Sequence, residues 1–298
     1  MTCYGFIGLG NMGGGMAAVL AAAGHRVQAF DLSAAALARA VEAGASACRS
    51  AVEAVTGAEV VLTMLPAGAH VREVYAQAIL PHATPRALLI DCSTIDVDSA
   101  RAIAQQAQAA GFAVADAPVS GGVAGAAAGT LTFMVGCAEA DVQRIKAALS
   151  PMAKTVVRAG DAGAGQAAKI CNNLLLGISM IGVCEALTLA EGLGLDPDRF
   201  FEIASTSSGQ CWSLTAYSPW PGQVEGAPSG RKYEGGFAAA MMLKDLRLAQ
   251  GAAASVGAAT PLGAQAQALY ALFDRLGYGE RDFSGLLQML RGRLEDLA

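Results

Sequence analysis

The sequence predicts an α/β fold in which a doubly wound parallel sheet is followed by an all-α C-terminal domain. Two observations carry this prediction. Up to about residue 160, short β-like runs alternate with helix-length segments, which is typical of βαβ units. After residue 165, long helical stretches follow one another with almost no β-like alternation. We therefore expect a first domain over residues 1–162 and an all-helical domain over 163–298.

The expected elements follow from hydrophobic runs and their breakers. Strands are expected over residues 5–8, 27–31, 60–65, 88–91 and 112–116, and the runs 132–136 and 155–158 could extend the same sheet. Helices are expected over residues 165–193, 197–206, 237–257, 261–275 and 282–291, the first entering the second domain. Segment 209–236 is too long for an idle connection, and its four tryptophan and tyrosine residues argue against disorder.

Composition excludes several classes of protein. The net charge is -5, and the basic residues are scattered, so nucleic acid is not an expected partner. The seven cysteines lack a C-x-x-C pair, which indicates neither disulfides nor a metal cluster. The start of the chain lacks a basic signal region. The apolar stretch 174–184 is shorter than the roughly 20 residues that span a bilayer. We expect a soluble, cytoplasmic protein without a membrane partner.

A glycine-rich turn follows the first expected strand and precedes a helix expected over residues 16–23. Its residues are Gly8, Leu9, Gly10, Asn11, Met12 and Gly13. In a dinucleotide-binding turn, the first glycine allows the tight bend, the second lets the backbone approach the pyrophosphate, and the third lets helix and strand pack closely. The helix N-terminus then faces the phosphates. The motif alone is weak in so glycine-rich a chain, but its position after a strand predicts a Rossmann-type domain.

Asp31 ends the second expected strand, 21 residues after Gly10. An acid at this place hydrogen-bonds the ribose hydroxyls of the cofactor. Its carboxylate would repel a 2′-phosphate, and Leu32 and Ser33 offer no arginine to receive one, so NAD is preferred over NADP. The alternative is that Asp31 is an ordinary helix N-cap.

Two further strand ends would lie at the carboxyl edge of the sheet, where open α/β folds bind ligands. Leu65 ends the third expected strand and Pro66 follows it, and Thr94 follows the fourth expected strand. We expect these residues to line the nicotinamide. Simple turn and helix-capping chemistry is the alternative.

Lys169 and Asn173 are the leading candidates for chemistry. Residues four apart project from one helix face, about 5 to 6 Å apart at Cβ, so an amine and an amide can contact one substrate. A snorkelling lysine beside solvated asparagines is the alternative. After another expected strand, Ser120, Gly121 and Gly122 would offer a hydroxyl and backbone N–H groups to a carboxylate. A plain glycine turn would look the same.

In this order, residues 5–13, 116–122, 163–173 and 244–246 resemble the β-hydroxyacid dehydrogenase family, and the resemblance runs nearly end to end. It implies an NAD-dependent oxidoreductase with Lys169 as general acid/base. It further implies substrate contacts at Ser120, Gly121, Gly122 and Asn173, and places Lys244 near cofactor and substrate. One departure is Gly15, where the family often has proline, so we expect the first helix to start less rigidly.

Segment 208–237, which contains Trp212, resembles family members that oxidise 3-hydroxyisobutyrate to methylmalonate semialdehyde in valine breakdown. The resemblance makes Trp212 a substrate-binding candidate. In the expected reaction, hydride leaves the hydroxyl-bearing carbon for the nicotinamide while neutral Lys169 takes the hydroxyl proton. Burial, the helix N-terminus and the cationic nicotinamide all favour the neutral amine.

Other functions stay open at this stage. A sibling activity would oxidise L-serine or interconvert glycerate and tartronate semialdehyde, and a non-catalytic dinucleotide sensor would keep the fold without turnover. A histidine-dependent dehydrogenase is disfavoured because His25, His70 and His82 all precede the expected substrate residues. The apolar helical domain suggests a homodimer or homotetramer.

Overall fold

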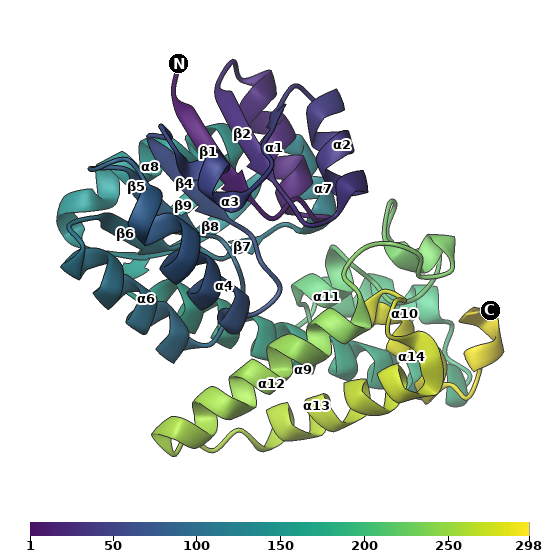
Figure 1. The fold of residues 1–298 in the computed structure, drawn as a ribbon. Helices are drawn as coiled ribbons and strands as arrows, with labels where there is room; N and C mark the ends of the chain where they lie inside the picture. The colour runs from purple at the N-terminus through teal and green to yellow at the C-terminus, as the bar shows by residue number, and fades with distance from the viewer. Residues whose placement is uncertain (298) are drawn as a thin grey trace. The chain divides into compact units, whose positions relative to one another are not determined.

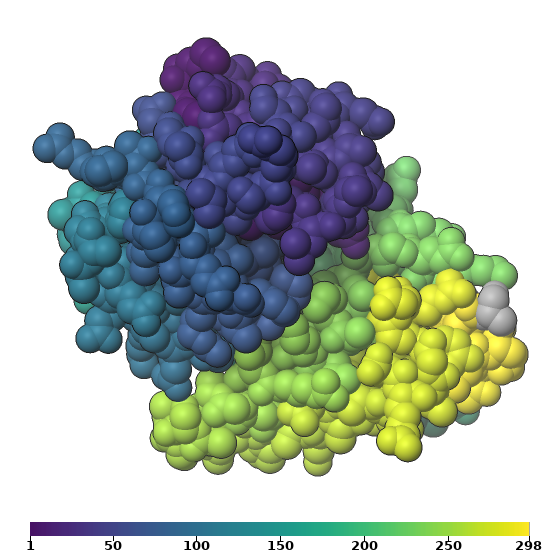
Figure 2. Space-filling view, in the orientation of Figure 1, coloured from purple at the N-terminus to yellow at the C-terminus, as the bar shows by residue number. Residues whose placement is uncertain are grey.

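The computed structural model describes residues 1–297, which divide into two compact units. The first is Met1–Lys169, and the second begins at Ile170. Figure 1 draws the first unit in purple to teal and the second in teal to yellow, and Figure 2 shows the surface in the same colours. The division falls inside one long helix, and the boundary expected near residue 163 falls just before that helix begins.

The first unit is built on a sheet. Its strands are β1 (Cys3–Ile7), β2 (Arg26–Phe30), β3 (Ser46–Ala47), β4 (Val60–Thr63), β5 (Leu88–Asp91), β6 (Ala113–Asp116), β7 (Val119–Ser120), β8 (Leu131–Cys137) and β9 (Ala153–Gly160). The order is β3-β2-β1-β4-β5-β6-β8-β7, with β9 paired to β8. From β3 to β6 every pair is parallel, which confirms the Rossmann-type prediction. The sheet is not wholly parallel, because β8 runs antiparallel to β6 and β7.

Helices cover both faces of this sheet (Figure 1). They are α1 (Gly13–Ala22), α2 (Ala34–Glu42), α3 (Ala51–Val55), α4 (Gly68–Val74), α5 (Leu80–His82), α6 (Val97–Ala109), α7 (Gly122–Ala128) and α8 (Val142–Leu149). Side chains alternate along each strand, so Phe6 enters the core under α1, α2 and α8, whereas Ile7 enters the core under α3, α4 and α6. Burial of both faces explains why the strands read as continuous apolar runs.

The second unit is helical. Its helices are α9 (Ala164–Gly192, which starts in the first unit), α10 (Pro197–Ser205), α11 (Trp212–Thr215), α12 (Ala239–Val256), α13 (Pro261–Phe273) and α14 (Leu286–Leu290). Gly177 lets α12 approach α9, since a Cβ there would lie 3.1 Å from Leu246 Cδ2. The helix expected over 282–291 is shorter, because its first turn is a 3-10 helix at Phe283–Gly285.

Segment 209–236 is packed rather than open. Tyr233 is 2% exposed, and its hydroxyl donates to the carbonyl of Pro219 over 2.7 Å. Tyr217 donates to Asp282 Oδ2 over 2.7 Å. The first bond closes the segment on itself, and the second ties it to Asp282. Tyr233 also belongs to the buried core of the second unit.

By length and composition alone, α9 is apolar enough to cross a membrane, with 29 residues and a mean hydropathy of 1.7 over its most apolar window. The expectation that its apolar part is too short is therefore wrong, because the helix continues on both sides of residues 174–184. The core helix of a soluble protein passes the same test, and Met180, Cys184 and Leu187 of α9 belong to the buried core of the second unit.

Candidate active site

The glycine turn between β1 and α1 has two glycines that the protein itself requires. Gly8 has φ +97°, and a Cβ there would lie 2.2 Å from the carbonyl oxygen of Met64. A Cβ on Gly13 would lie 2.0 Å from the carbonyl oxygen of Gly8. By contrast, a Cβ on Gly10 would meet no atom of the described chain within 4 Å. Open space at Gly10 fits the close backbone approach of a pyrophosphate.

Asp31 lies directly after β2 and is tied to the glycine turn. The backbone N–H of Leu9 donates to Asp31 Oδ2 over 2.6 Å, and that of Ser33 donates to Oδ1 over 2.7 Å. Ser33, not Asp31, is the N-cap of α2, because its Oγ accepts from the N–H of Ala36. Asp31 therefore does not cap this helix. The neighbouring residue, Leu32, is 95% exposed. These residues fit the ribose of NAD.

The loops after β4 and β5 are joined by Ser93. The N–H of Leu65 donates to Ser93 Oγ over 2.8 Å, and Ser93 Oγ–H donates to Asp91 Oδ1 over 2.6 Å. Helix α6 is capped by Asp96, so neither Ser93 nor Thr94 is its N-cap. Thr94 is half-buried and Pro66 is exposed beside these bonds.

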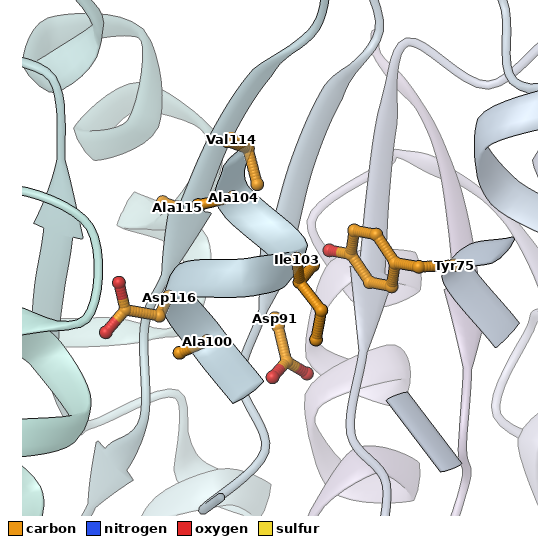
Figure 3. Close-up of a pocket in the computed structure, with 8 residues that line it drawn as sticks. All are labelled: Tyr75, Asp91, Ala100, Ile103, Ala104, Val114, Ala115 and Asp116. Atoms are coloured by element: carbon orange, nitrogen blue, oxygen red, sulfur yellow. The ribbon is translucent and has the colours of Figure 1, made fainter. Parts of the chain in front are cut away.

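Asp91 ends β5 opposite Asp116 of β6 and borders a small cavity of about 10 Å³, the room that one water needs (Figure 3). Burial raises the pKa of Asp91 from 3.8 to about 6. Asp91 Oδ2 and the hydroxyl of Tyr75, another lining residue, have no hydrogen-bond partner within residues 1–297. The apolar run 88–91 predicted a strand, but it did not indicate that the carboxylate of Asp91 is buried beside a cavity.

Asp116 holds the start of α9. Its Oδ1 accepts from the N–H of Gly163 over 2.7 Å, and its Oδ2 accepts from that of Gln166 over 2.8 Å. Burial raises the pKa of Asp116. Gly165 lets the start of α9 lie this close to the sheet, since a Cβ there would lie 2.3 Å from the carbonyl oxygen of Met134 in β8. The helix that carries Lys169 is thus capped by a strand-end carboxylate.

The predicted proton-transfer and carboxylate-binding residues of the first unit have distinct settings. Lys169 is only 9% exposed, in the second turn of α9. Ser120 is half-buried at the end of β7, and Gly121 and Gly122 are exposed with φ of +133° and +65°. Residues with positive φ at an exposed turn present backbone N–H groups that suit an anion.

In the second unit, Asn173 is held by a residue that the sequence reading missed. Asn173 Nδ2 donates to Asp245 Oδ2 over 2.5 Å, and Asn173 Oδ1 accepts from Asn172 Nδ2 over 3.0 Å. Lys244 Nζ lies 3.7 Å from Asp245 Oδ1. The predicted Asn173 and Lys244 are therefore brought to one carboxylate. The available signal was Asp245, the one acid of α12, directly after Lys244.

Trp212 is the first residue of α11 and is 52% exposed. Its ring stacks on that of Tyr217, with centroids 4.9 Å apart. Its indole is thus supported on one face.

A nucleotide-binding turn, an acid after β2 and a buried lysine on the helix that leaves the sheet define an NAD-dependent dehydrogenase. Residues 3–160 match the family described as the NAD-binding domain of 6-phosphogluconate dehydrogenase. Residues 163–290 match the family described as NAD-binding of NADP-dependent 3-hydroxyisobutyrate dehydrogenase. The chain belongs to the β-hydroxyacid dehydrogenase family, in its 3-hydroxyisobutyrate dehydrogenase group, which confirms the resemblance read from the sequence.

Individual relatives that match nearly the whole chain are dehydrogenases of small hydroxy acids. The 3-hydroxyisobutyrate dehydrogenase of Pseudomonas aeruginosa is 48% identical, over 98% of this chain and 100% of that protein. The NAD-dependent L-serine dehydrogenase of the same organism is 50% identical, over 95% of this chain and 96% of that protein. The solved structure of Mycobacterium tuberculosis 3-hydroxyisobutyrate dehydrogenase with L-serine has a TM-score of 0.93 at 45% identity, covering 98% of this chain and 99% of that one.

Proposed function

We propose that this chain oxidises 3-hydroxyisobutyrate to methylmalonate semialdehyde with NAD, a step of valine breakdown. The observation that carries the proposal is the burial of Lys169 in the second turn of α9, directly after a helix start that is bonded to the strand end at Asp116. An amine in this place at the carboxyl edge of the sheet can reach a substrate beside the nicotinamide. The names of the relatives supply the substrate class.

The cofactor site fits NAD. Bound NAD would supply the hydride acceptor for the hydroxyl-bearing carbon of the substrate. The turn from Gly8 to Gly13 would hold the pyrophosphate, and Asp31 would accept hydrogen bonds from the adenosine ribose. Leu65, Pro66 and Thr94 would line the nicotinamide, with Lys244 nearby. The negative charge of Asp31 supports a preference for NAD over NADP.

The residues of the chain would divide the remaining work. The neutral amine of Lys169 takes the proton of the substrate hydroxyl, and in the reverse direction the ammonium returns it. One hydrogen of Asn173 Nδ2 is bonded to Asp245, so its second hydrogen can donate to the substrate oxygen. The Ser120 hydroxyl and the N–H groups of Gly121 and Gly122 would hold the carboxylate. Trp212 would border the substituent at C2.

L-Serine oxidation is the second candidate. It is favoured by the 50% identical L-serine dehydrogenase and by the related structure that contains L-serine. L-Serine carries an ammonium where 3-hydroxyisobutyrate carries a methyl group, so the two substrates place opposite demands on the same pocket. We expect kcat/KM to be higher for 3-hydroxyisobutyrate, measured by NADH absorbance with both cofactors. A higher kcat/KM for L-serine would reverse the order, and NADH binding without turnover of either substrate or of glycerate would indicate a sensor.

Replacement of Lys169 tests the chemistry. Lys169→Ala should lower kcat by at least about 100-fold, because general acid/base catalysis contributes about 10² to 10⁴ in rate. NADH should still bind. The matched control is Lys154→Ala, which removes an exposed lysine of β9 and should leave kcat unchanged. Near-wild-type turnover of Lys169→Ala would remove this lysine from the mechanism.

We further propose that the chain is a cytoplasmic homodimer or homotetramer. The second unit exposes large apolar side chains, with Leu189 62%, Leu193 75% and Ile203 58% exposed. Covering such side chains between subunits is favourable. Light scattering coupled to size-exclusion chromatography gives the mass directly, and a monomer at micromolar concentration would contradict this proposal.

A further inference from the structure

We propose that Gln166 is a positioning residue that fixes Lys169 against the two loops expected to face the nicotinamide. Gln166 lies one turn before Lys169 in α9 and is completely buried, with 0% exposure. The inference rests on the proposed function, because it concerns how the amine of Lys169 is aimed in that reaction.

The amide of Gln166 binds the backbone on both sides of Thr94. Its Nε2 donates to the carbonyl of Ser93 over 2.7 Å, and its Oε1 accepts from the N–H of Ile95 over 3.1 Å. The Gln166 amide thus bonds to the residue before Thr94 with its donor and to the residue after Thr94 with its acceptor. These two bonds fix the backbone at Thr94. A glutamine is required for this pattern, since a carboxylate cannot donate to the Ser93 carbonyl.

The same bonds reach the second loop. Ser93 Oγ accepts from the N–H of Leu65 over 2.8 Å and donates to Asp91. Leu65, Thr94 and Lys169 are therefore joined through Ser93 and Gln166 within the first unit. The backbone N–H of Gln166 donates to Asp116. Gln166 is therefore held at its backbone by Asp116 and at its side chain by Ser93 and Ile95, so the start of α9 cannot shift without breaking these hydrogen bonds.

Gln166→Met keeps the length of the side chain and removes both amide bonds, whereas Gln166→Glu keeps the acceptor and removes the donor. We expect kcat per NADH-binding site to fall about 10- to 100-fold in Gln166→Met, because small misplacements of catalytic groups cost rates of this size. Gln166→Glu should fall by less. The Kd of NADH should change less than threefold in both. The deuterium isotope effect on kcat, with substrate labelled at the hydroxyl-bearing carbon, should rise as the chemical steps become limiting.

Gln28→Met is the matched control. Gln28 is a buried glutamine of β2, 6% exposed, whose Nε2 donates to the carbonyls of Ala54 and Thr56. Its replacement should lower the melting temperature without changing kcat per NADH-binding site or the isotope effect. A purely structural role for Gln166 would give the same result as Gln28→Met.

The outcomes separate the two proposals. If wild type oxidises a 3-hydroxy acid and Gln166→Met retains kcat within twofold, or shows an unchanged isotope effect, the positioning role is overturned. If wild type binds NADH but reduces no NAD with 3-hydroxyisobutyrate, L-serine or glycerate, the proposed function itself fails, and the positioning role with it.

Discussion

Asn173 Nδ2 and Asp245 Oδ2 form a side-chain hydrogen bond of 2.5 Å, buried within the second unit between α9 and α12. The carboxylate accepts only, so it fixes which end of the amide faces it. Rotating the amide by 180° would bring Asn173 Oδ1 against Asp245. The amide oxygen therefore points toward Asn172, whose Nδ2 donates to it.

Removal of Asp245 should disorient this amide. We expect Asp245→Ala to lower kcat at least about tenfold and to lower the free energy of unfolding by about 1 to 3 kcal/mol, because the buried Asn173 loses its partner. Asn172→Ala, which truncates an exposed neighbour, should change both quantities much less. Steady-state kinetics and urea unfolding measure them. Equal effects of the two substitutions would contradict a specific role for Asp245.

Two glycines of the nucleotide turn should respond to alanine in opposite ways. Gly13→Ala places a Cβ 2.0 Å from the Gly8 carbonyl oxygen, so overpacking should cost about 1 to 3 kcal/mol of stability. Gly10→Ala meets open space in the protein and should leave the melting temperature nearly unchanged. It should nevertheless raise the KM for NAD, because the methyl group stands where the pyrophosphate approaches. An unchanged KM in Gly10→Ala would place the pyrophosphate elsewhere.

Cofactor preference should depend on the charge of Asp31. The double change Asp31→Ser with Leu32→Arg replaces the acid by a hydroxyl and places a cation at the exposed position 32. We expect the ratio of kcat/KM for NAD to that for NADP to fall at least about tenfold, since a charge-assisted hydrogen bond is lost and a phosphate partner gained. Leu32→Arg alone should shift the ratio less, because Asp31 still repels the phosphate. An unchanged ratio in the double variant would exclude Asp31 as the determinant.

Asp91 makes stability depend on pH. Burial raises the pKa of Asp91 from 3.8 to about 6, so the folded chain binds this proton more tightly than the unfolded chain. Ionisation therefore lowers the free energy of unfolding as pH rises from about 4 to 6, by about 3 kcal/mol. Asparagine does not titrate, so Asp91→Asn should gain stability relative to wild type over this range.

Urea unfolding at pH 4, 5, 6 and 7 measures this difference. Asp98→Asn, which neutralises an exposed acid of α6, is the control and should show a nearly constant difference. A constant difference for Asp91→Asn as well would mean that Asp91 titrates near its ordinary value.

Trp212 should affect the substrate more than the fold. It is half exposed, and its stacking on Tyr217 is the kind of aromatic pair worth about 0.5 to 1.5 kcal/mol. Trp212→Ala should raise the KM for 3-hydroxyisobutyrate and reduce its preference over L-serine, with little change in the Kd of NADH. Trp220→Ala removes the ring that lies under Arg291 in the same segment and should change stability without changing preference. If both variants changed the substrate preference equally, the preference would depend on the whole segment and not on Trp212 in particular.

The sequence alone determined the class of fold and the nucleotide turn. Alternating strand and helix patterns, the spacing of Gly8, Gly10 and Gly13, and the acid after β2 are local signals, because each arises from a few consecutive residues. The spacing of Lys169 and Asn173, four residues apart in one helix, is also a local signal. No local pattern in the sequence indicates that β8 runs antiparallel, because the direction of a strand depends on how the chain before it folds back.

Only the tertiary structure decided which polar residues support the site. Gln166 bonds to Ser93 and Ile95, 73 and 71 residues away, and Asn173 bonds to Asp245, 72 residues away. Asp116 caps a helix that begins 48 positions later, at Ala164. Such partners come together because burial forces each polar group to find a hydrogen bond wherever the fold supplies one. Which group lies within reach is set by the packing of strands and helices, and sequence spacing does not encode it.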